Sequence, residues 1–268
     1  MKRILLLAAL PQEYAHMLGM TGLWRRLAKK PFKVFSKDNG EWTWFLVETG
    51  MGQERFGEAL QWSSHSLQPD CILKFGFVGS LSADLSVGSV VLGDSFFAYD
   101  DSGKTVSGGI QAHIGRELSG FCSGHGVRVA RFVTTNRPLP KGPLLAKFAD
   151  RTTVLDMESA AAARHAASKG IPFLCLGAVS DAAEHEIGFD LDTITDSRGA
   201  VDIRKVLAAV VRDPKLIGTF YRNWKRSSLA GRNMGDVLRD FLALHAPVHG
   251  DSRAAERLWR TGEEDGGA

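Results

Sequence analysis

Cysteine is scarce in this sequence of 268 residues, and the net charge is small. The three cysteines, Cys71, Cys122 and Cys175, form no C-x-x-C pair and have no histidine cluster nearby, which argues against a disulfide framework and a zinc site. A formal net charge of +3 is too small to predict binding to nucleic acid or to a membrane surface. The scarcity of cysteine favours a protein of the reducing cytoplasm.

Long hydrophobic runs are missing as well. The N-terminal segment ILLLAAL is seven residues long, far short of the roughly 20 that cross a bilayer, and it lacks the small-residue cleavage site of a secretory signal. It therefore predicts a buried strand. The G-x-G-x-x-G, P-loop, H-E-x-x-H and G-x-S-x-G patterns are also absent, which leaves dinucleotide, Walker-type phosphate, zinc-protease and serine-hydrolase functions without support.

Apolar runs alternate with helical patterns through the first 180 residues. The runs are continuous, as in strands that are covered on both faces, so we expect one α/β domain with a largely parallel sheet. The expected strands are Ile4–Leu7, Thr43–Glu48, Cys71–Phe75, Ser89–Leu92, Arg128–Thr134, Thr152–Leu155 and Phe173–Ala178. The expected helices are Gln12–Met20, Arg55–Ser66, Pro143–Phe148 and Ser159–Lys169.

The last third of the chain has a different pattern. Residues 213–246 predict two added helices with a break at Gly231, so that the domain spans residues 1–246. Residues 247–268 are polar and rich in glycine, which predicts a disordered tail. Basic residues gather beside aromatic ones around Trp24 and again around Trp224. Both patches are interpreted as solvated helix faces, with membrane contact through the second as the alternative.

Three acids follow expected strands at their carboxyl ends, which is where ligands bind in open α/β sheets. They are Glu13, Glu158 and Asp181, and we expect them to share one cleft. Each could instead serve a local role, because acids are common at the caps and first turns of helices. Glycines beside two further strand ends, such as Gly52 and Gly76, would let the backbone approach a ligand closely.

Five segments resemble successive motifs of the purine nucleoside phosphorylase/nucleosidase superfamily. They are LLAALPQEYAHML, ETGMGQERFGEAL, FGFVGSLSADLSVGSVVLGD, VLDMESAAAA and LGAVSDAAE, and they span roughly residues 1–186. The branch that they resemble most is the 5′-methylthioadenosine/S-adenosylhomocysteine nucleosidases. This resemblance implies a three-layer α/β/α sandwich with a central mixed sheet, extended here by the C-terminal helices, and a homodimer or higher homo-oligomer. It implies hydrolysis of the N-glycosidic bond of a 5′-modified adenine nucleoside, with release of adenine and without a metal or cofactor.

The resemblance also assigns roles to single residues. In the M-E-S-A-A motif the glutamate, here Glu158, holds the ribose 2′- and 3′-hydroxyls, and Met157 packs beneath the sugar. Asp181 protonates the purine at N7, and Glu13 activates the attacking water. These roles agree with the chemistry, because a carboxylate stabilises an oxocarbenium-like sugar and the purine leaves readily only when it is protonated.

Further residues are expected near the substrate by the same resemblance: Met51, Gly52, Gly76, Phe77 and Asp156. Asp156 stands where these nucleosidases usually have glutamate, and it is interpreted as a capping or supporting residue. Phe77 replaces a small hydroxyl residue that helps phosphorylases bind phosphate, which favours water as the nucleophile. Phosphorolysis, hydrolysis of adenosylhopane or futalosine, and a nucleoside-binding sensor without turnover stay open as alternatives.

Overall fold

The computed structural model describes residues 2–100, 105–112, 114–137, 139–184 and 216–244, together with the single positions 205, 208, 212 and 213. The strands are β1 (Lys2–Ala8), β2 (Arg25–Ala28), β3 (Lys33–Asp38), β4 (Trp42–Glu48), β5 (Cys71–Ser80), β6 (Val90–Tyr99), β7 (Thr105–Gln111), β8 (Arg128–Thr135), β9 (Thr153–Asp156) and β10 (Phe173–Asp181). The helices are α1 (Pro11–Met20), α2 (Gln53–Leu67), α3 (Arg116–Gly124), α4 (Gly142–Lys147), α5 (Ser159–Lys169) and α7 (Leu216–Leu244).

These strands form one mixed sheet that is partly closed. β1 pairs in parallel with β4 and β5, and β3 and β2 extend the β4 edge in antiparallel orientation. Beyond β5 the sheet curls round on itself, because β5 pairs with both β9 and β10, and β8 and β6 connect these two strands. The predicted central mixed sheet is confirmed.

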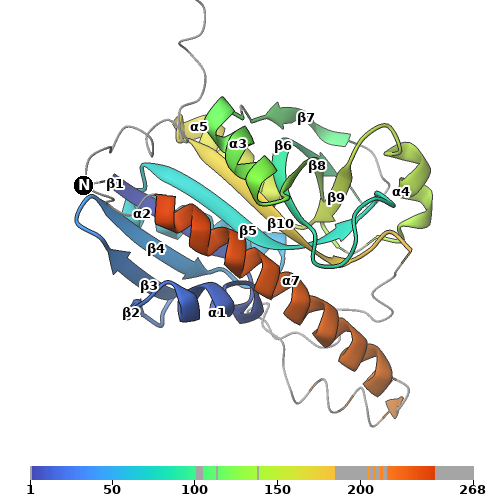
Figure 1. The fold of residues 1–268 in the computed structure, drawn as a ribbon, viewed down its shortest axis with the longest axis horizontal. Coiled ribbons are helices and arrows are strands. Elements are labelled where there is room, and N and C mark those ends of the chain that lie inside the picture. The colour runs from blue at the N-terminus through green and yellow to red at the C-terminus, as the bar shows by residue number, and fades with distance from the viewer. Residues whose placement is uncertain are drawn as a thin grey trace, which may run out of the picture.

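Helices cover both faces of the sheet (Figure 1). On one face α1, α3 and α7 pack against apolar side chains of β1, β4, β5 and β10, such as Leu6 and Leu73. On the other face α2 and α5 pack against the alternate side chains of the same sheet, such as Leu5 and Ile72. The continuous apolar runs of these strands follow from this double coverage. The three-layer α/β/α sandwich is therefore confirmed.

The patch around Trp24 was expected on a helix, and this expectation is wrong. Residues Arg25–Ala28 form the edge strand β2, which pairs only with β3 among the described strands. Arg25 and Arg26 are exposed there. Charged side chains are common on such edges, because they discourage pairing with other chains. The basic composition of this segment therefore marks a sheet edge.

The break expected at Gly231 is also wrong, because α7 runs without interruption from Leu216 to Leu244. A Cβ atom at Gly231 would lie 2.4 Å from the backbone oxygen of Gln12. Glycine in a helix costs about 1 kcal/mol relative to alanine, and here its missing side chain lets α7 lie directly against α1. Gly231 thus serves close packing between helices. The predicted tail, residues 247–268, lies outside the described residues.

Two observations bear on the surroundings of the protein. Cys71, Cys122 and Cys175 are all buried and free, and burial raises the pKa of these thiols to about 12, 11 and 12. Thiols with such pKa values are almost entirely protonated at neutral pH and react slowly. Within the described part of the chain, no helix has both the length and the apolar character needed to cross a membrane.

Candidate active site

A cavity of about 420 Å³ opens where β1, β8, β9 and β10 end. Its wall is completed by β5 and by two residues of α7, Asn223 and Ser227. The three predicted acids, Glu13, Glu158 and Asp181, all line it. The lining residues are Ala9, Leu10, Glu13, Met51, Phe77, Val78, Gly79, Thr135, Leu139, Pro140, Lys141, Leu155, Asp156, Met157, Glu158, Ser180, Asp181, Asn223 and Ser227.

Glu13 lies on the first turn of α1, close behind the end of β1. Its carboxylate accepts three backbone N–H groups, from Ala9 at 2.7 Å, Leu10 at 3.0 Å and Phe77 at 2.9 Å. The bond from Leu10 is the local one expected of a first-turn acid, whereas the bond from Phe77 connects the carboxylate to β5. Burial raises the pKa of Glu13, and the N–H donors and the charge of Lys74 oppose this rise.

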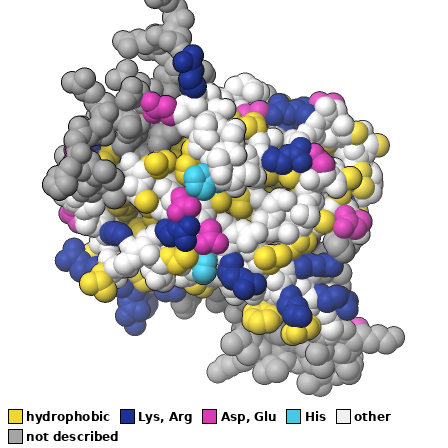
Figure 2. All heavy atoms as spheres, in the orientation of Figure 1, with side chains coloured by type: hydrophobic (Ala, Val, Ile, Leu, Met, Phe, Trp, Pro, Cys, Tyr) yellow, Lys and Arg dark blue, Asp and Glu magenta, His cyan; other side chains and the backbone are white. Residues whose placement is uncertain are grey.

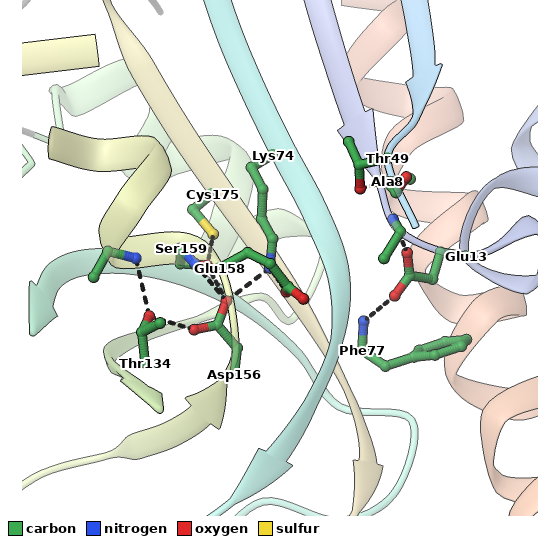
Figure 3. A network of polar contacts seen from close by, with 12 residues as sticks. Ala8, Glu13, Thr49, Lys74, Phe77, Thr134, Asp156, Glu158, Ser159 and Cys175 are labelled. Atoms are coloured by element: carbon green, nitrogen blue, oxygen red, sulfur yellow. Dashed lines mark hydrogen bonds and ion pairs between the residues drawn. The ribbon is translucent and has the colours of Figure 1, made fainter. Parts of the chain in front are cut away.

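Asp156, the last residue of β9, is surrounded by donors (Figure 3). It accepts bonds from Thr134 Oγ1 at 2.6 Å, from Lys74 Nζ at 2.7 Å and from the backbone N–H of Ser159 at 2.8 Å. The bond from Ser159, at the start of α5, is the one that the capping interpretation expects. Burial alone would raise the pKa of Asp156, but Lys74 and the hydrogen bonds outweigh burial and lower it.

Glu158 is two residues further along and has far weaker partners. Its Oε1 accepts the backbone N–H of Gly52 at 3.4 Å, and its Oε2 lies 3.6 Å from Lys74 Nζ. Although it is the N-cap residue of α5, its side chain makes no capping bond, so the local alternative explains Glu158 poorly. Burial, together with the charges of Asp156 and Glu13, raises the pKa of Glu158 to about 7, against the opposing charge of Lys74.

Asp181 ends β10 and pairs with a buried lysine. Its Oδ2 lies 2.5 Å from Lys141 Nζ, and its Oδ1 accepts a bond from Ser180 Oγ at 2.9 Å. The Lys141 ammonium also donates to the backbone oxygens of Asp181 at 3.0 Å and Ala182 at 2.8 Å. Burial raises the pKa of Asp181, and Lys141 opposes the rise. A Cβ atom at Gly79 would lie 2.7 Å from Asp181 Oδ2, so glycine is needed there.

The other predicted substrate residues lie in or behind the cavity. Met51, Phe77 and Met157 line it. Gly52 and Gly76 lie beside two of the acids. The Gly52 N–H donates to Glu158 Oε1 at 3.4 Å, and a Cβ at Gly76 would lie 2.8 Å from Glu13 Oε1. The arrangement brings the predicted residues together around one space.

Two buried cations, Lys74 and Lys141, were not predicted from the sequence. Lys74 interrupts the apolar run CILKFGFVGS, and a charge within a buried strand requires an opposite charge nearby, which is a signal that could have been used. Lys141 follows β8 in the segment RPLPKGP, where a lysine is unremarkable. No group of three or more His, Cys, Asp or Glu side chains suited to a metal ion is present among the described residues.

Residues 3–212 match the family model described as the phosphorylase superfamily. The chain belongs to the phosphorylase superfamily. The family membership expected from the five motifs is thereby confirmed, and the chain is an enzyme of this superfamily. No curated protein matches the chain by sequence.

Solved structures of superfamily enzymes share the fold. The 5′-methylthioadenosine/S-adenosylhomocysteine nucleosidase of Neisseria meningitidis, in complex with methylthio-immucillin-A, has a TM-score of 0.63 at 17% identity, covering 90% of this chain and 100% of that chain. The futalosine hydrolase of Helicobacter pylori has a TM-score of 0.66 at 13% identity, with 90% and 97% covered. A methylthioadenosine nucleosidase mutant of the same organism, with 5′-methylthioadenosine in its active site, has a TM-score of 0.63 at 13% identity, with 90% and 99% covered.

Proposed function

We propose that this enzyme hydrolyses the N-glycosidic bond of a 5′-modified adenine nucleoside of the methylthioadenosine or S-adenosylhomocysteine type. Water attacks C1′ of the ribose, the bond from C1′ to the base breaks, and the base leaves as adenine after gaining a proton. Glu13 accepts the proton of the water, and Asp181 donates a proton to N7 of the purine. The products are adenine and a 5′-modified ribose, and the reaction needs no cofactor.

The observation that carries this proposal is the position of two buried carboxylates along β5. Glu13 contacts the strand at Gly76 and Asp181 contacts it at Gly79. Three residues of an extended strand span about 10 Å, so the two carboxylates meet the strand at separate points. A base and an acid that serve opposite sides of one bond require such a separation, because water and sugar must fit between them.

Glu158 completes the proposal as the group that holds the ribose. Its carboxylate lines the cavity and accepts only long contacts from the part of the chain that the structure describes, so its oxygens keep capacity for two hydroxyl donors. Met157 lines the cavity beside it and provides an apolar surface for the sugar. A carboxylate at the ribose also stabilises the positive charge that develops on the sugar in the transition state.

Phe77 supports water over phosphate as the nucleophile. Its side chain lines the cavity at the position where related phosphorylases have a small hydroxyl residue, and its backbone N–H is already bonded to Glu13. A phosphate ion therefore finds neither the hydroxyl nor this N–H group at the expected place.

The test is release of adenine from 5′-methylthioadenosine, S-adenosylhomocysteine, adenosine and aminofutalosine, each with and without phosphate. Hydrolysis yields the free ribose derivative at the same rate in both conditions. Strict dependence on phosphate, with ribose 1-phosphate as the product, would instead identify a phosphorylase. Tight binding without release of any base over hours would identify a nucleoside sensor.

The outer end of α7 favours a second candidate, a lipid-linked adenine nucleoside such as adenosylhopane. This end projects beyond the sheet (Figure 1) and carries exposed hydrophobic and basic side chains (Figure 2). Tyr221 and Trp224 are 53% and 60% exposed and stack on each other, and Lys225 lies over the Tyr221 ring. Aromatic and basic groups together suit the headgroup layer of a membrane, and α7 also lines the cavity.

Flotation with vesicles of anionic and of neutral phospholipid separates the two candidates. Salt-sensitive flotation with anionic vesicles that is lost when Arg222 and Lys225 are changed to Glu supports the lipid-linked substrate. Absence of flotation at low salt supports the thionucleosides. A cytoplasmic location and a homo-oligomer complete the proposal, and sedimentation of the purified chain tests the second of these.

A further inference from the structure

Lys74 lies in the middle of β5 with its side chain buried behind the proposed ribose site. Its ammonium is 2.7 Å from Asp156 Oδ2 and 3.6 Å from Glu158 Oε2, and Figure 3 shows it between the two acids. Burying an ammonium group is costly unless opposite charges surround it. Lys74 serves no step of the reaction described above, so its position calls for a separate account.

The two acids beside Lys74 differ in how completely they are bonded. Asp156 accepts hydrogen bonds from Lys74, from Thr134 and from both the N–H and the hydroxyl of Ser159, so its oxygens are fully engaged by the protein. Among the described residues Glu158 has only its two long contacts, and it faces the cavity. Asp156 is therefore an anchor for the ammonium, and Glu158 is the acid left to bind a ligand.

Titratable groups on four elements lie near Glu158, and the charges on three of them affect whether it is ionised. Lys74 on β5 favours the charged form, whereas Asp156 on β9 and Glu13 on α1 oppose it. Cys175 on β10 pairs in register with Lys74 and stays protonated at neutral pH. Adjacent ribose hydroxyls offer two O–H donors, and a charged carboxylate accepts both, whereas a protonated acid gives up acceptor capacity.

We propose that Lys74 is a positioning residue for the ribose site: its charge favours the ionised form of Glu158, which accepts the two hydroxyls. Asp156 holds the ammonium in place, and its negative charge offsets part of the effect of the ammonium on Glu158. The inference rests on the ribose-binding role proposed for Glu158. It predicts opposite effects for the loss of Lys74 and the loss of the Asp156 charge, which a purely structural role does not.

The first experiment titrates Glu158 itself, by NMR of protein labelled with ¹³C at the glutamate carboxyl carbons. The Glu158 signal is assigned as the one that is lost in Glu158→Gln. Lys74→Met is expected to move its midpoint up by about 1–3 pH units, because an opposite charge within 4–6 Å has an effect of this size. Asp156→Asn is expected to move the midpoint down, because a repelling charge is gone and the ammonium can turn toward Glu158.

The double variant Lys74→Met/Asp156→Asn removes one charge of each sign and provides the matched control. Its midpoint is expected between those of the two single variants. If Lys74→Met fails to fold because Asp156 is left unpaired, Asp156→Asn and the double variant still test the inference, because the Glu158 midpoint should be lower in Asp156→Asn than in the double variant. Midpoints that do not move, or that move in the same direction in both single variants, overturn the inference.

The second experiment measures binding of formycin A, an adenosine analogue whose C-glycosidic bond resists hydrolysis. At pH 7, Lys74→Met is expected to weaken binding by about fivefold or more, and binding should recover above the new midpoint. Binding of 2′,3′-dideoxyadenosine, which lacks both hydroxyls, should not respond to the variant. An equal loss for both compounds overturns the role at the ribose. The NMR titration needs neither ligand nor turnover, so it still tests the inference if the proposed reaction is wrong.

Discussion

At the β1 end of the cavity the carboxylate of Glu13 is held by neutral backbone N–H groups, whereas at the β10 end the carboxylate of Asp181 is held by the ammonium of Lys141. Both acids are buried, and burial raises the pKa of both. Their immediate partners nevertheless differ in charge. No ion pair involves Glu13 in the part of the chain that the structure describes.

This difference suits the two roles proposed for the acids. Backbone dipoles fix Glu13 in one orientation without neutralising it, so it can accept a proton from water without breaking an ion pair. The ammonium of Lys141 stabilises the Asp181 carboxylate that remains once the proton has passed to the purine. Under the proposed roles, one cavity holds a fixed base at one end and a charge-compensated acid at the other.

The largest expected effect comes from neutralising each acid in turn. Glu13→Gln and Asp181→Asn should each lower kcat by about 10²–10⁴-fold while nucleoside binding persists, because general acid–base groups contribute this much. A substrate with a permanent positive charge on the purine separates them. In 7-methyladenosine N7 needs no proton, so Asp181→Asn should recover most of its activity on it and Glu13→Gln should not. Recovery of Glu13→Gln instead would reverse the assignments.

Gly76→Ala and Gly79→Ala, both on β5, should each disturb one end of the cavity. A Cβ at Gly76 would lie 2.8 Å from Glu13 Oε1, and one at Gly79 would lie 2.7 Å from Asp181 Oδ2, so each carboxylate must move. A displacement approaching 1 Å costs up to about 10²-fold in rate, and we expect a 10–100-fold loss of kcat from each change. Only Gly79→Ala should regain activity on 7-methyladenosine.

Gly57→Ala is the matched control for these changes. It lies on α2, and a Cβ there would meet nothing within 4 Å. Its kcat should equal that of the parent enzyme, and the alanine should make the helix slightly more stable. Full activity of Gly76→Ala would contradict the place given to Glu13.

Lys141→Met tests the β10 end of the cavity through the pH dependence of kcat. Lys141 opposes the rise in the pKa of Asp181, so Lys141→Met should raise that pKa further. An acid that must be protonated then stays active to higher pH, and the alkaline limb of the kcat profile should move up by about one pH unit. Lys147→Met, at an exposed lysine of α4, should leave the limb unchanged. An unmoved limb in Lys141→Met would argue against Asp181 as the proton donor.

The sequence predicts some of the residues at the two ends of the cavity and not others. Glu13 and Asp181 were predictable, because each follows an apolar run that could only be a covered strand, and strand ends meet at one edge of a sheet. Lys141 was not, because its role depends on the fold of a loop that brings it to Asp181 of β10 across 40 positions. Lys74 carried a usable signal, since a lone charge in a buried run implies a partner.

The errors in the fold have the same origin. Gly231 looks like a helix break in isolation, and only the closeness of α1 explains a glycine in the middle of α7. The basic segment that became β2 has no apolar pattern of its own, and its pairing with β3 decides its structure. Local pattern therefore predicted covered strands well, whereas features set by distant neighbours needed the structure.

The smallest expected effect is on stability, and it distinguishes Glu13 from Asp181 without a measurement of activity. Burial raises the pKa of Glu13 above its unfolded value, so the folded protein binds this proton more tightly than the unfolded chain, and stability falls as the pH rises through the folded pKa. Glu13→Gln removes that penalty and can still accept backbone N–H bonds. At pH 7 its Tm should rise by about 2–4 °C, which corresponds to about 1 kcal/mol in a chain of this size.

Asp181→Asn should gain less. Burial raises the pKa of Asp181 as well, which favours a neutral side chain, but the substitution also leaves Lys141 buried without its counter-charge, and this loss offsets the gain. Thermal unfolding of both variants at pH 7 and near pH 4 checks the comparison. The advantage of Glu13→Gln should shrink toward pH 4, where Glu13 is protonated in the folded protein and increasingly so in the unfolded chain. If Asp181→Asn were stabilised as much as Glu13→Gln, the ammonium of Lys141 would not be what distinguishes the two ends of the cavity.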